Sequence, residues 1–196
     1  MKVKICGITN LEDALAAIEA GADALGFVFY DKSPRYIDQF EAKRIVEQIP
    51  PFIQTVGLFV NENSTFINQI CTNAKMQLAQ IIDDDQYTDF VSLNYKHIKV
   101  VRAQSEKDII ENQDEYVLID AFVESFGGEG KRVALEWFKH VDCSKIILAG
   151  GLNENNLQEL KGLGFYGVDV SSGVELSKGK KDKLKMINFV KAANEI

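Results

Sequence analysis

Short apolar runs alternate with amphipathic segments along the whole chain. Eight runs of four to six residues have the length and the flanking turn residues of β-strands; they are residues 3–6, 24–29, 55–60, 76–81, 98–102, 116–119, 145–149 and 166–170. Between them, apolar residues recur with helical spacing at Leu11, Ala14, Leu15 and Ile18, again at Ala42, Ile45, Val46 and Ile49, and more briefly at Leu157 and Leu160. The pattern predicts strands that alternate with helices.

Residues at the ends of the first two helical segments have the chemistry of helix caps. Thr9 or Asn10 is suited to begin the first helix, and Gly21 is suited to end it. Asp38 and Glu41 resemble a capping box at the start of the second helix. The boundaries therefore support the helical interpretation.

Eight strand–helix units favour a closed barrel. Near-continuous apolar strands are typical of parallel strands covered on both faces, and eight such units favour a (β/α)8 barrel over an open, doubly wound sheet. We predict a single (β/α)8 TIM barrel over residues 1–196. Such barrels begin at about 200 residues, so this one must be of minimal size, with its active site on short loops at the carboxyl ends of the strands.

Composition and charge argue against several classes of binding partner. A formal charge of −7 argues against nucleic acid, and no apolar run approaches the roughly 20 residues of a membrane span. The opening segment is too short for the apolar core of a signal peptide, and Cys6, Cys71 and Cys143 lack the paired spacing of zinc or redox motifs. We expect a cytoplasmic protein with reduced thiols, either a monomer or a homodimer.

Two glycine- and serine-rich segments follow the last two predicted strands. They are Ala149-Gly150-Gly151-Leu152 and Asp169-Val170-Ser171-Ser172-Gly173. A Gly-Gly pair alone usually serves a tight turn. Two glycine-rich segments at the strand ends where barrels commonly bind phosphate instead favour an anion site, formed by backbone N–H groups and the hydroxyls of Ser171 and Ser172. This site requires no lysine, and we expect a phosphorylated small molecule as its ligand. Asp169 receives no role.

Three further residues stand at predicted strand ends. Cys6 ends the first strand, Arg35 follows the second, and Asp120 follows the sixth. Each also has a structural interpretation, because cysteine is often an inert core residue, a loop arginine is usually solvated, and aspartate often caps a turn. The acidic run 83–85 and the lysine-rich stretch 178–185 are interpreted as solvated surface.

Six sets of motifs, read in order, cover nearly the whole chain. They are Lys4-Ile5-Cys6-Gly7-Ile8-Thr9, Gly26-Phe27-Val28-Phe29 with Ser33-Pro34-Arg35-Tyr36-Ile37, Val56-Gly57-Leu58-Phe59-Val60, Gly127-Gly128-Glu129-Gly130, Ala149-Gly150-Gly151-Leu152, and Val168-Asp169-Val170-Ser171-Ser172-Gly173-Val174-Glu175. Together they resemble the phosphoribosylanthranilate isomerase family, and the opening and closing motifs are hard to obtain by chance.

The resemblance implies a step of tryptophan biosynthesis that uses no metal and no nicotinamide cofactor. This step is the Amadori rearrangement of N-(5-phosphoribosyl)anthranilate to 1-(2-carboxyphenylamino)-1-deoxyribulose 5-phosphate. In that family the cysteine of the first motif is the general base and the aspartate after the sixth strand is the general acid; these positions are Cys6 and Asp120 here. The resemblance further implies that Arg35 holds the anthranilate carboxylate, and that the phosphate is bound by Gly150, Gly151, Ser171, Ser172 and Gly173.

The fourth strand departs from the family pattern. The family usually has Gln-Leu-His-Gly and then an acidic residue there, whereas this chain has Gln77-Leu78-Ala79-Gln80-Ile81. Because the acid and the base lie on other strands, we expect an altered pocket wall rather than lost chemistry. Two alternatives stay open: another phosphosugar isomerase or epimerase barrel, and a non-catalytic phosphate-binding barrel.

The implied chemistry needs a protonated Asp120 and a deprotonated Cys6 at the same time. With reference pKa values, about 3% of cysteine is thiolate and about 0.1% of aspartate is protonated at pH 7. The site must therefore raise the pKa of Asp120 and lower that of Cys6, or act through a rare form with reversed protonation.

Overall fold

The eight predicted strands close into one parallel barrel. The computed structural model describes residues 1–121 and 132–196, so the predicted motif 127–130 lies outside the described residues. Neighbouring strands pair in sequence order, and the last pairs with the first; they are β1 (Lys2–Cys6), β2 (Ala24–Val28), β3 (Gln54–Val60), β4 (Leu78–Ile82), β5 (Lys96–Ala103), β6 (Val117–Ala121), β7 (Ile146–Leu148) and β8 (Gly167–Val170). Closure is visible in the register of β1, where Lys4 lies opposite both Ala24 of β2 and Asp169 of β8. The predicted (β/α)8 barrel is confirmed.

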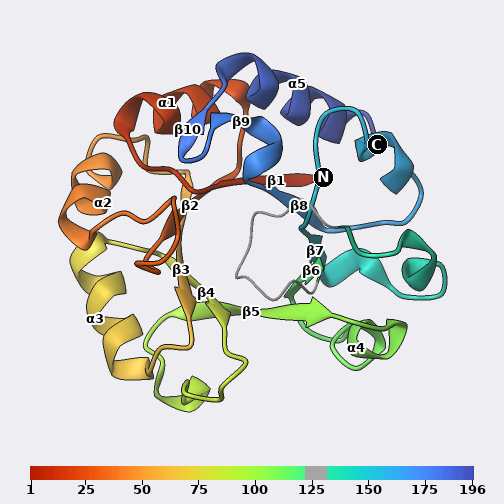
Figure 1. Cartoon of the computed structure of the whole chain (residues 1–196), viewed down its shortest axis with the longest axis horizontal. Coiled ribbons are helices and arrows are strands. Elements are labelled where there is room, and N and C mark those ends of the chain that lie inside the picture. The colour runs from red at the N-terminus through yellow and green to blue at the C-terminus, as the bar shows by residue number, and fades with distance from the viewer. Residues whose placement is uncertain (122–131) are drawn as a thin grey trace.

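The α-helices lie outside the ring of strands (Figure 1). In the described residues they are α1 (Leu11–Ala20), α2 (Gln39–Val46), α3 (Ser64–Ala74), α4 (Glu106–Ile110) and α5 (Lys183–Asn194). No helix within 1–121 or 132–196 is long and apolar enough to cross a membrane.

Single 3-10 turns take the place of longer helices in several connections. Within the part of the chain that the structure describes, these turns are η1 (Phe90–Ser92), η2 (Leu135–Phe138), η3 (Cys143–Lys145), η4 (Leu157–Leu160) and η5 (Ser172–Val174). The short helix predicted at Leu157 and Leu160 is therefore one 3-10 turn, which is followed by Gly162 and Gly164 with φ of 83° and 76°. Such short connections allow a chain below the usual barrel size to close.

The caps of the first two helices follow the sequence prediction in most respects. Asn10 is the N-cap of α1, since its side chain accepts a hydrogen bond from the N–H of Asp13, and Gly21 ends the helix with φ of 100°. Thr9, the alternative cap, instead donates to the carbonyl of Gly179 at 2.8 Å. Asp38 caps α2, but that helix ends at Val46 and excludes Ile49, which was part of the predicted period.

Alternate strand residues face either the helices or the barrel interior. The helix-facing side is a continuous apolar core that includes fully buried Leu25, Phe27, Phe59, Ile81 and Ile119. Because side chains alternate along a strand, residues two positions apart share a face. The interior face is thus free to carry polar side chains at the carboxyl end of the barrel.

A short antiparallel hairpin follows β8. It consists of β9 (Glu175–Ser177) and β10 (Lys180–Lys181) and lies beside α1, although the two segments are far apart in sequence (Figure 1). The backbone N–H of Lys181 donates to the carboxylate of Asp13 on α1 at 2.9 Å. The hairpin is therefore fixed to the first strand–helix unit of the barrel.

Candidate active site

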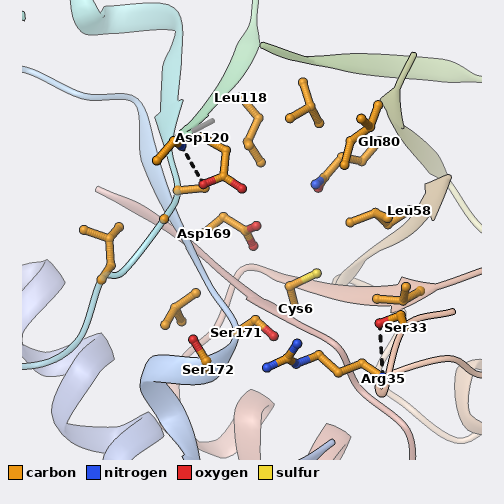
Figure 2. A pocket seen from close by; sticks show the side chains of 18 of the residues that line it. Cys6, Ser33, Arg35, Leu58, Gln80, Leu118, Asp120, Asp169, Ser171 and Ser172 are labelled. Atoms are coloured by element: carbon orange, nitrogen blue, oxygen red, sulfur yellow. Dashed lines mark hydrogen bonds between the residues drawn. The ribbon is translucent and has the colours of Figure 1, made fainter. Parts of the chain in front are cut away.

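A pocket opens at the carboxyl end of the barrel, and residues from most of the strands line it. Figure 2 shows the side chains of Cys6, Asp120 and Asp169 directed into the same cavity. The lining includes every site residue named from the sequence: Cys6, Arg35, Asp120, Gly150, Gly151, Ser171, Ser172 and Gly173. The structure thus brings together residues that lie more than a hundred positions apart in the chain.

The thiol of Cys6 lies over a strand position that carries no side chain. A Cβ atom on Gly26 of β2 would come 2.7 Å from the Sγ of Cys6 and 3.0 Å from the Cε of Lys4. Lys4 precedes Cys6 by two residues and so shares its face of β1. Its ammonium donates to Oδ1 of Asp169 at 2.7 Å, and both side chains are buried. A thiol and a carboxylate that line the pocket therefore meet a buried ammonium at its floor.

The carboxyl of Asp120 sits in an environment that favours its neutral form. Burial raises the pKa of Asp120 to about 6, and the negative charge of Asp169 acts in the same direction. The N–H of Ala121, which donates to Oδ1 of Asp120 at 2.8 Å, opposes the rise. At pH 7 roughly a tenth of this carboxyl is then protonated, compared with about 0.1% for an ordinary aspartate.

The pKa of Cys6 is raised, whereas the first of the two expectations from the sequence is a lowered pKa. Burial raises the pKa of the thiol, and the positive charges of Lys4 and Lys181 only partly offset this effect. The site therefore supplies the expected rise at Asp120 without the expected fall at Cys6. Raised pKa values at both groups favour the second expectation, that the active form is the rare one in which Asp120 is protonated and Cys6 is ionised.

Arg35 is buried rather than solvated, with 6% of its surface exposed. Its Nε and Nη2 donate to the two carboxylate oxygens of Glu175 at 2.7 and 2.8 Å. The side chain also passes so close to Gly7 that a Cβ atom there would lie 2.6 Å from the Cδ of Arg35 and 3.1 Å from the Oγ of Ser171. Gly7 therefore makes room for Arg35 and Ser171 to lie side by side.

The two glycine-rich segments form one continuous wall of the pocket. Gly150 and Gly151 have φ of 87° and 62°, a backbone conformation that favours glycine. A Cβ atom on Gly173 would lie only 1.9 Å from the carbonyl oxygen of Leu152, so the two segments are in direct backbone contact. This close approach aligns backbone groups from both segments along the same side of the cavity.

The structure places Gln80, and not Gln77, at the pocket. Gln77 lies before β4, and its side-chain oxygen accepts from Gln54 and from the N–H of Thr55. Gln80 and Ile82 are the β4 residues that line the pocket. If the family's Gln-Leu pair is matched to Gln80-Ile81, the next residues are Ile82 and Asp83, so His and Gly are absent in this register too.

The acidic run 83–85 lies at the surface, as the sequence interpretation has it, with Asp84 and Asp85 exposed and Asp83 half-buried, but its side chains are also held by specific contacts. Asp83 accepts from the N–H groups of Tyr87 and Thr88. Asp84 forms an ion pair with Arg102, and Asp85 accepts from the amide of Asn61. These contacts tie the loop after β4 to its neighbours on either side.

The lysine-rich stretch 178–185 is solvated as expected except at one residue. The side chain of Lys181 has no exposed surface and donates to Oε1 of Glu175 at 3.0 Å. Neighbouring Lys178, Lys180, Lys183 and Lys185 are exposed, as expected of a solvated run. One lysine of the run is therefore turned into the protein.

Four residues at the site received no role from the sequence, and only two of them had a local signal. Lys4 stands two positions before Cys6 and Asp169 two positions before Ser171, so strand alternation alone predicts that they face the interior. Glu175 and Lys181 had no comparable signal, because Glu175 pairs with Arg35 across 140 residues.

The fold and the pocket together define a (β/α)8-barrel enzyme class in which a thiol and a weakly acidic carboxyl face a cavity walled by two glycine-rich segments. Residues 3–192 match the family model described as N-(5'phosphoribosyl)anthranilate (PRA) isomerase. The chain belongs to this family, which confirms the resemblance read from its motifs.

Relatives and solved structures agree with this assignment over the full length. A curated relative named N-(5'-phosphoribosyl)anthranilate isomerase, from a Nitratiruptor species, is 60% identical over 193 residues, or 98% of each chain. The crystal structure of phosphoribosyl anthranilate isomerase from Thermus thermophilus matches with a TM-score of 0.88 at 31% identity, covering 100% of this chain and 99% of that one. A phosphoribosyl anthranilate isomerase in complex with reduced 1-(o-carboxyphenylamino)-1-deoxyribulose 5-phosphate matches with a TM-score of 0.83 at 35% identity, covering all of both chains.

Proposed function

We propose that the chain catalyses the Amadori rearrangement of N-(5-phosphoribosyl)anthranilate to 1-(2-carboxyphenylamino)-1-deoxyribulose 5-phosphate, with Asp120 as general acid and Cys6 as general base. The observation that carries this proposal is the shared cavity, in which both groups face a wall built from two glycine-rich segments. Membership of the isomerase family supports the reaction, and the raised pKa of Asp120 supports its assignment as the acid.

The reaction needs one proton delivered and one removed. Asp120 protonates the ribose ring oxygen, the ring opens, and a Schiff base forms between the anthranilate nitrogen and C1′. Cys6 as thiolate then removes the proton from C2′, which gives an enolamine that tautomerises to the ketone. The acid loses one proton and the base gains one, so the pair ends as ionised Asp120 and neutral Cys6.

This proton balance explains why two raised pKa values are compatible with catalysis. The active form, neutral Asp120 with ionised Cys6, holds the same number of protons as the more abundant form with ionised Asp120 and neutral Cys6. Their ratio is therefore independent of pH, and the fraction of enzyme in the active form stays constant between the two apparent pKa values of the pair. The buried ammonium of Lys4, close to both Cys6 and Asp169, stabilises the thiolate within this minority form.

The phosphate and the anthranilate carboxylate of the substrate are held by two different groups of pocket residues. The phosphate binds along Gly150, Gly151, Ser171, Ser172 and Gly173. The anthranilate carboxylate binds Arg35, whose guanidinium has five N–H donors, of which Glu175 takes two. A solved relative bound to a phosphorylated ribulose compound supports a ligand of this class.

The compartment and the assembly state belong to the same proposal. We place the protein in the cytoplasm, where its three free, buried cysteines stay reduced. Monomer and homodimer are the assembly states proposed, and equilibrium sedimentation of the purified protein decides between them.

Complementation of a tryptophan-requiring strain that lacks this isomerase tests the proposed function. Wild type should restore growth without tryptophan, whereas Cys6→Ala and Asp120→Asn should not. Cys71→Ala is the matched control, because Cys71 is a buried thiol on α3 that does not line the pocket. Failure of the wild type to restore growth, with soluble protein present, would favour a non-catalytic phosphate-binding barrel.

A further inference from the structure

Lys181 lies between the two proposed substrate-binding ends of the pocket. Its ammonium donates to the carbonyl oxygen of Ser171 at 3.2 Å and to the Oγ of the same serine at 3.4 Å. It also donates to Oε1 of Glu175 at 3.0 Å. One fully buried lysine thus contacts both a phosphate-wall residue and the carboxylate that pairs with Arg35.

Glu175 is shared between two cations. Its Oε1 accepts from Arg35 Nε at 2.7 Å and from Lys181 Nζ at 3.0 Å, while its Oε2 accepts from Arg35 Nη2 at 2.8 Å. The result is a continuous chain of charged hydrogen bonds that runs from Arg35 through Glu175 and Lys181 to Ser171. Such charge-assisted bonds fix geometry more firmly than neutral ones.

The hairpin that carries Lys181 is itself held in place. Besides the bond from the Lys181 N–H to Asp13, the ammonium of Lys185 donates to the carbonyl oxygen of Glu175 at 2.8 Å. Anchored at both ends, the hairpin sets where the buried ammonium stands. The position of Ser171 and the orientation of Arg35 therefore depend on the same anchored element.

Burial of three charged groups is a costly way to hold a fold together. Replacement of a buried ion cluster by apolar residues is often neutral or stabilising, so stability alone gives little reason for such a cluster. Placement of the Arg35 guanidinium and of Ser171 against an anionic ligand does give a reason for a buried charged cluster. The cluster also carries one net positive charge, from two cations and one carboxylate, which suits an anionic substrate.

We propose that Glu175 and Lys181 are positioning residues that couple the two ends of the substrate pocket: Lys181 holds Ser171 for the phosphate and fixes Glu175, which in turn orients Arg35 for the anthranilate carboxylate. The inference rests on the proposed function, because it takes the two subsites from it. It adds two residues to which the motifs gave no role.

Separate probes for the two ends test the coupling. Dissociation constants of inorganic phosphate and of anthranilate are measured by NMR titration for wild type, Lys181→Met, Glu175→Gln and Lys180→Met. Lys181→Met should weaken both probes by about tenfold, the scale of losing a hydrogen bond to a charged group. Lys180→Met is the matched control, since Lys180 is the exposed neighbour in the same strand, and both constants should stay within about twofold of wild type.

The Glu175→Gln variant distinguishes the positioning of Arg35 from simple electrostatic attraction between the pocket and an anionic ligand. This change makes the pocket more positive, so attraction alone predicts tighter binding of both anions. Positioning predicts that anthranilate binds about tenfold more weakly while phosphate binding stays close to wild type, because Lys181 still contacts Ser171. If Lys181→Met does not fold, as judged by its thermal transition, the near-isosteric Glu175→Gln carries the test.

Turnover of the phosphorylated substrate is measured alongside. The coupling predicts that KM rises more than kcat falls in Glu175→Gln. In Lys181→Met both constants should change, because this variant also removes a positive charge that lowers the pKa of Cys6. Unchanged dissociation constants in Lys181→Met, or tighter anthranilate binding in Glu175→Gln, would overturn the coupling even if the wild type is active. A wild type that binds phosphate but shows no turnover would instead overturn the proposed function.

Discussion

The Sγ of Cys6 occupies the space that a side chain on Gly26 would need, since a Cβ atom at position 26 would lie 2.7 Å from it. Gly26→Ala must therefore push the thiol aside. Because a displacement of about 1 Å at a reacting group can cost roughly a hundredfold in rate, we expect kcat to fall by that order. Steady-state kinetics on purified protein measure this loss.

Gly57→Ala is the control for overpacking. A Cβ atom on Gly57 would also be crowded, at 3.0 Å from Phe59 and 3.1 Å from Phe29, but in the core away from Cys6. Both variants should lose about 1–3 kcal/mol of stability, whereas only Gly26→Ala should lose turnover. Equal kinetic losses in the two variants would mean that thiol placement is not what Gly26 protects.

The raised pKa of Asp120 is directly measurable. Carbon-13 NMR of the side-chain carboxyl in the ligand-free enzyme should show one titration near pH 6 that is missing in Asp120→Asn. An inflection near pH 4, the range of an ordinary aspartate, would remove the reason to treat Asp120 as the acid.

The raised pKa of Asp120 also means that its ionised carboxylate destabilises the folded protein at neutral pH. Its folded-state pKa of about 6 lies above the ordinary value of 3.8, so the folded state binds this proton more tightly than the unfolded state. The favourable contribution of the neutral carboxyl is complete below pH 4 and is lost as the pH rises through 6. Asp120→Asn should thus be more stable than wild type at pH 7.5, by up to about 3 kcal/mol, and similar to it at pH 3.5.

Urea unfolding at the two pH values checks this prediction. Asp114→Asn serves as the control, because Asp114 is exposed and its removal should change stability equally little at both pH values. A loss of stability in Asp120→Asn at pH 7.5 would show that the carboxylate is stabilised, not penalised, in the folded protein.

Arg35→Lys should affect binding more than turnover. Lysine keeps the positive charge but cannot form the two parallel hydrogen bonds of a guanidinium, either to Glu175 or to a substrate carboxylate. We expect KM to rise about tenfold or more with a smaller change in kcat. Arg44→Lys on the exposed side of α2 should leave both constants unchanged, and a wild-type KM in Arg35→Lys would count against the carboxylate-binding role.

Local pattern and topology were enough to predict the barrel and most of its site. Once eight parallel strands close, their carboxyl ends converge on one mouth, so Cys6 and Asp120 could be placed together without any knowledge of side-chain contacts. The motif resemblance then supplied roles that position alone left undecided.

What the sequence could not predict depends on contacts between distant segments or on strand register. The apolar run 76–81 contains β4 only in part, since the strand spans Leu78–Ile82, and Gln80 and Ile82, rather than Gln77, line the pocket. Lys181 looks like its solvated neighbours because a two-residue strand has no readable alternation. Its burial follows from the hairpin's position against α1 and Glu175.

Conversion of N-(5-phosphoribosyl)anthranilate by purified wild type, Cys6→Ala, Asp120→Asn and Cys71→Ala is the most direct measurement. Removal of a positioned general acid or base typically costs about 10²–10⁴-fold, so kcat of the first two variants should fall by that factor while Cys71→Ala retains wild-type turnover. All four proteins should remain folded. A folded Cys6→Ala or Asp120→Asn variant that turns over within tenfold of wild type would contradict the assignment of base and acid.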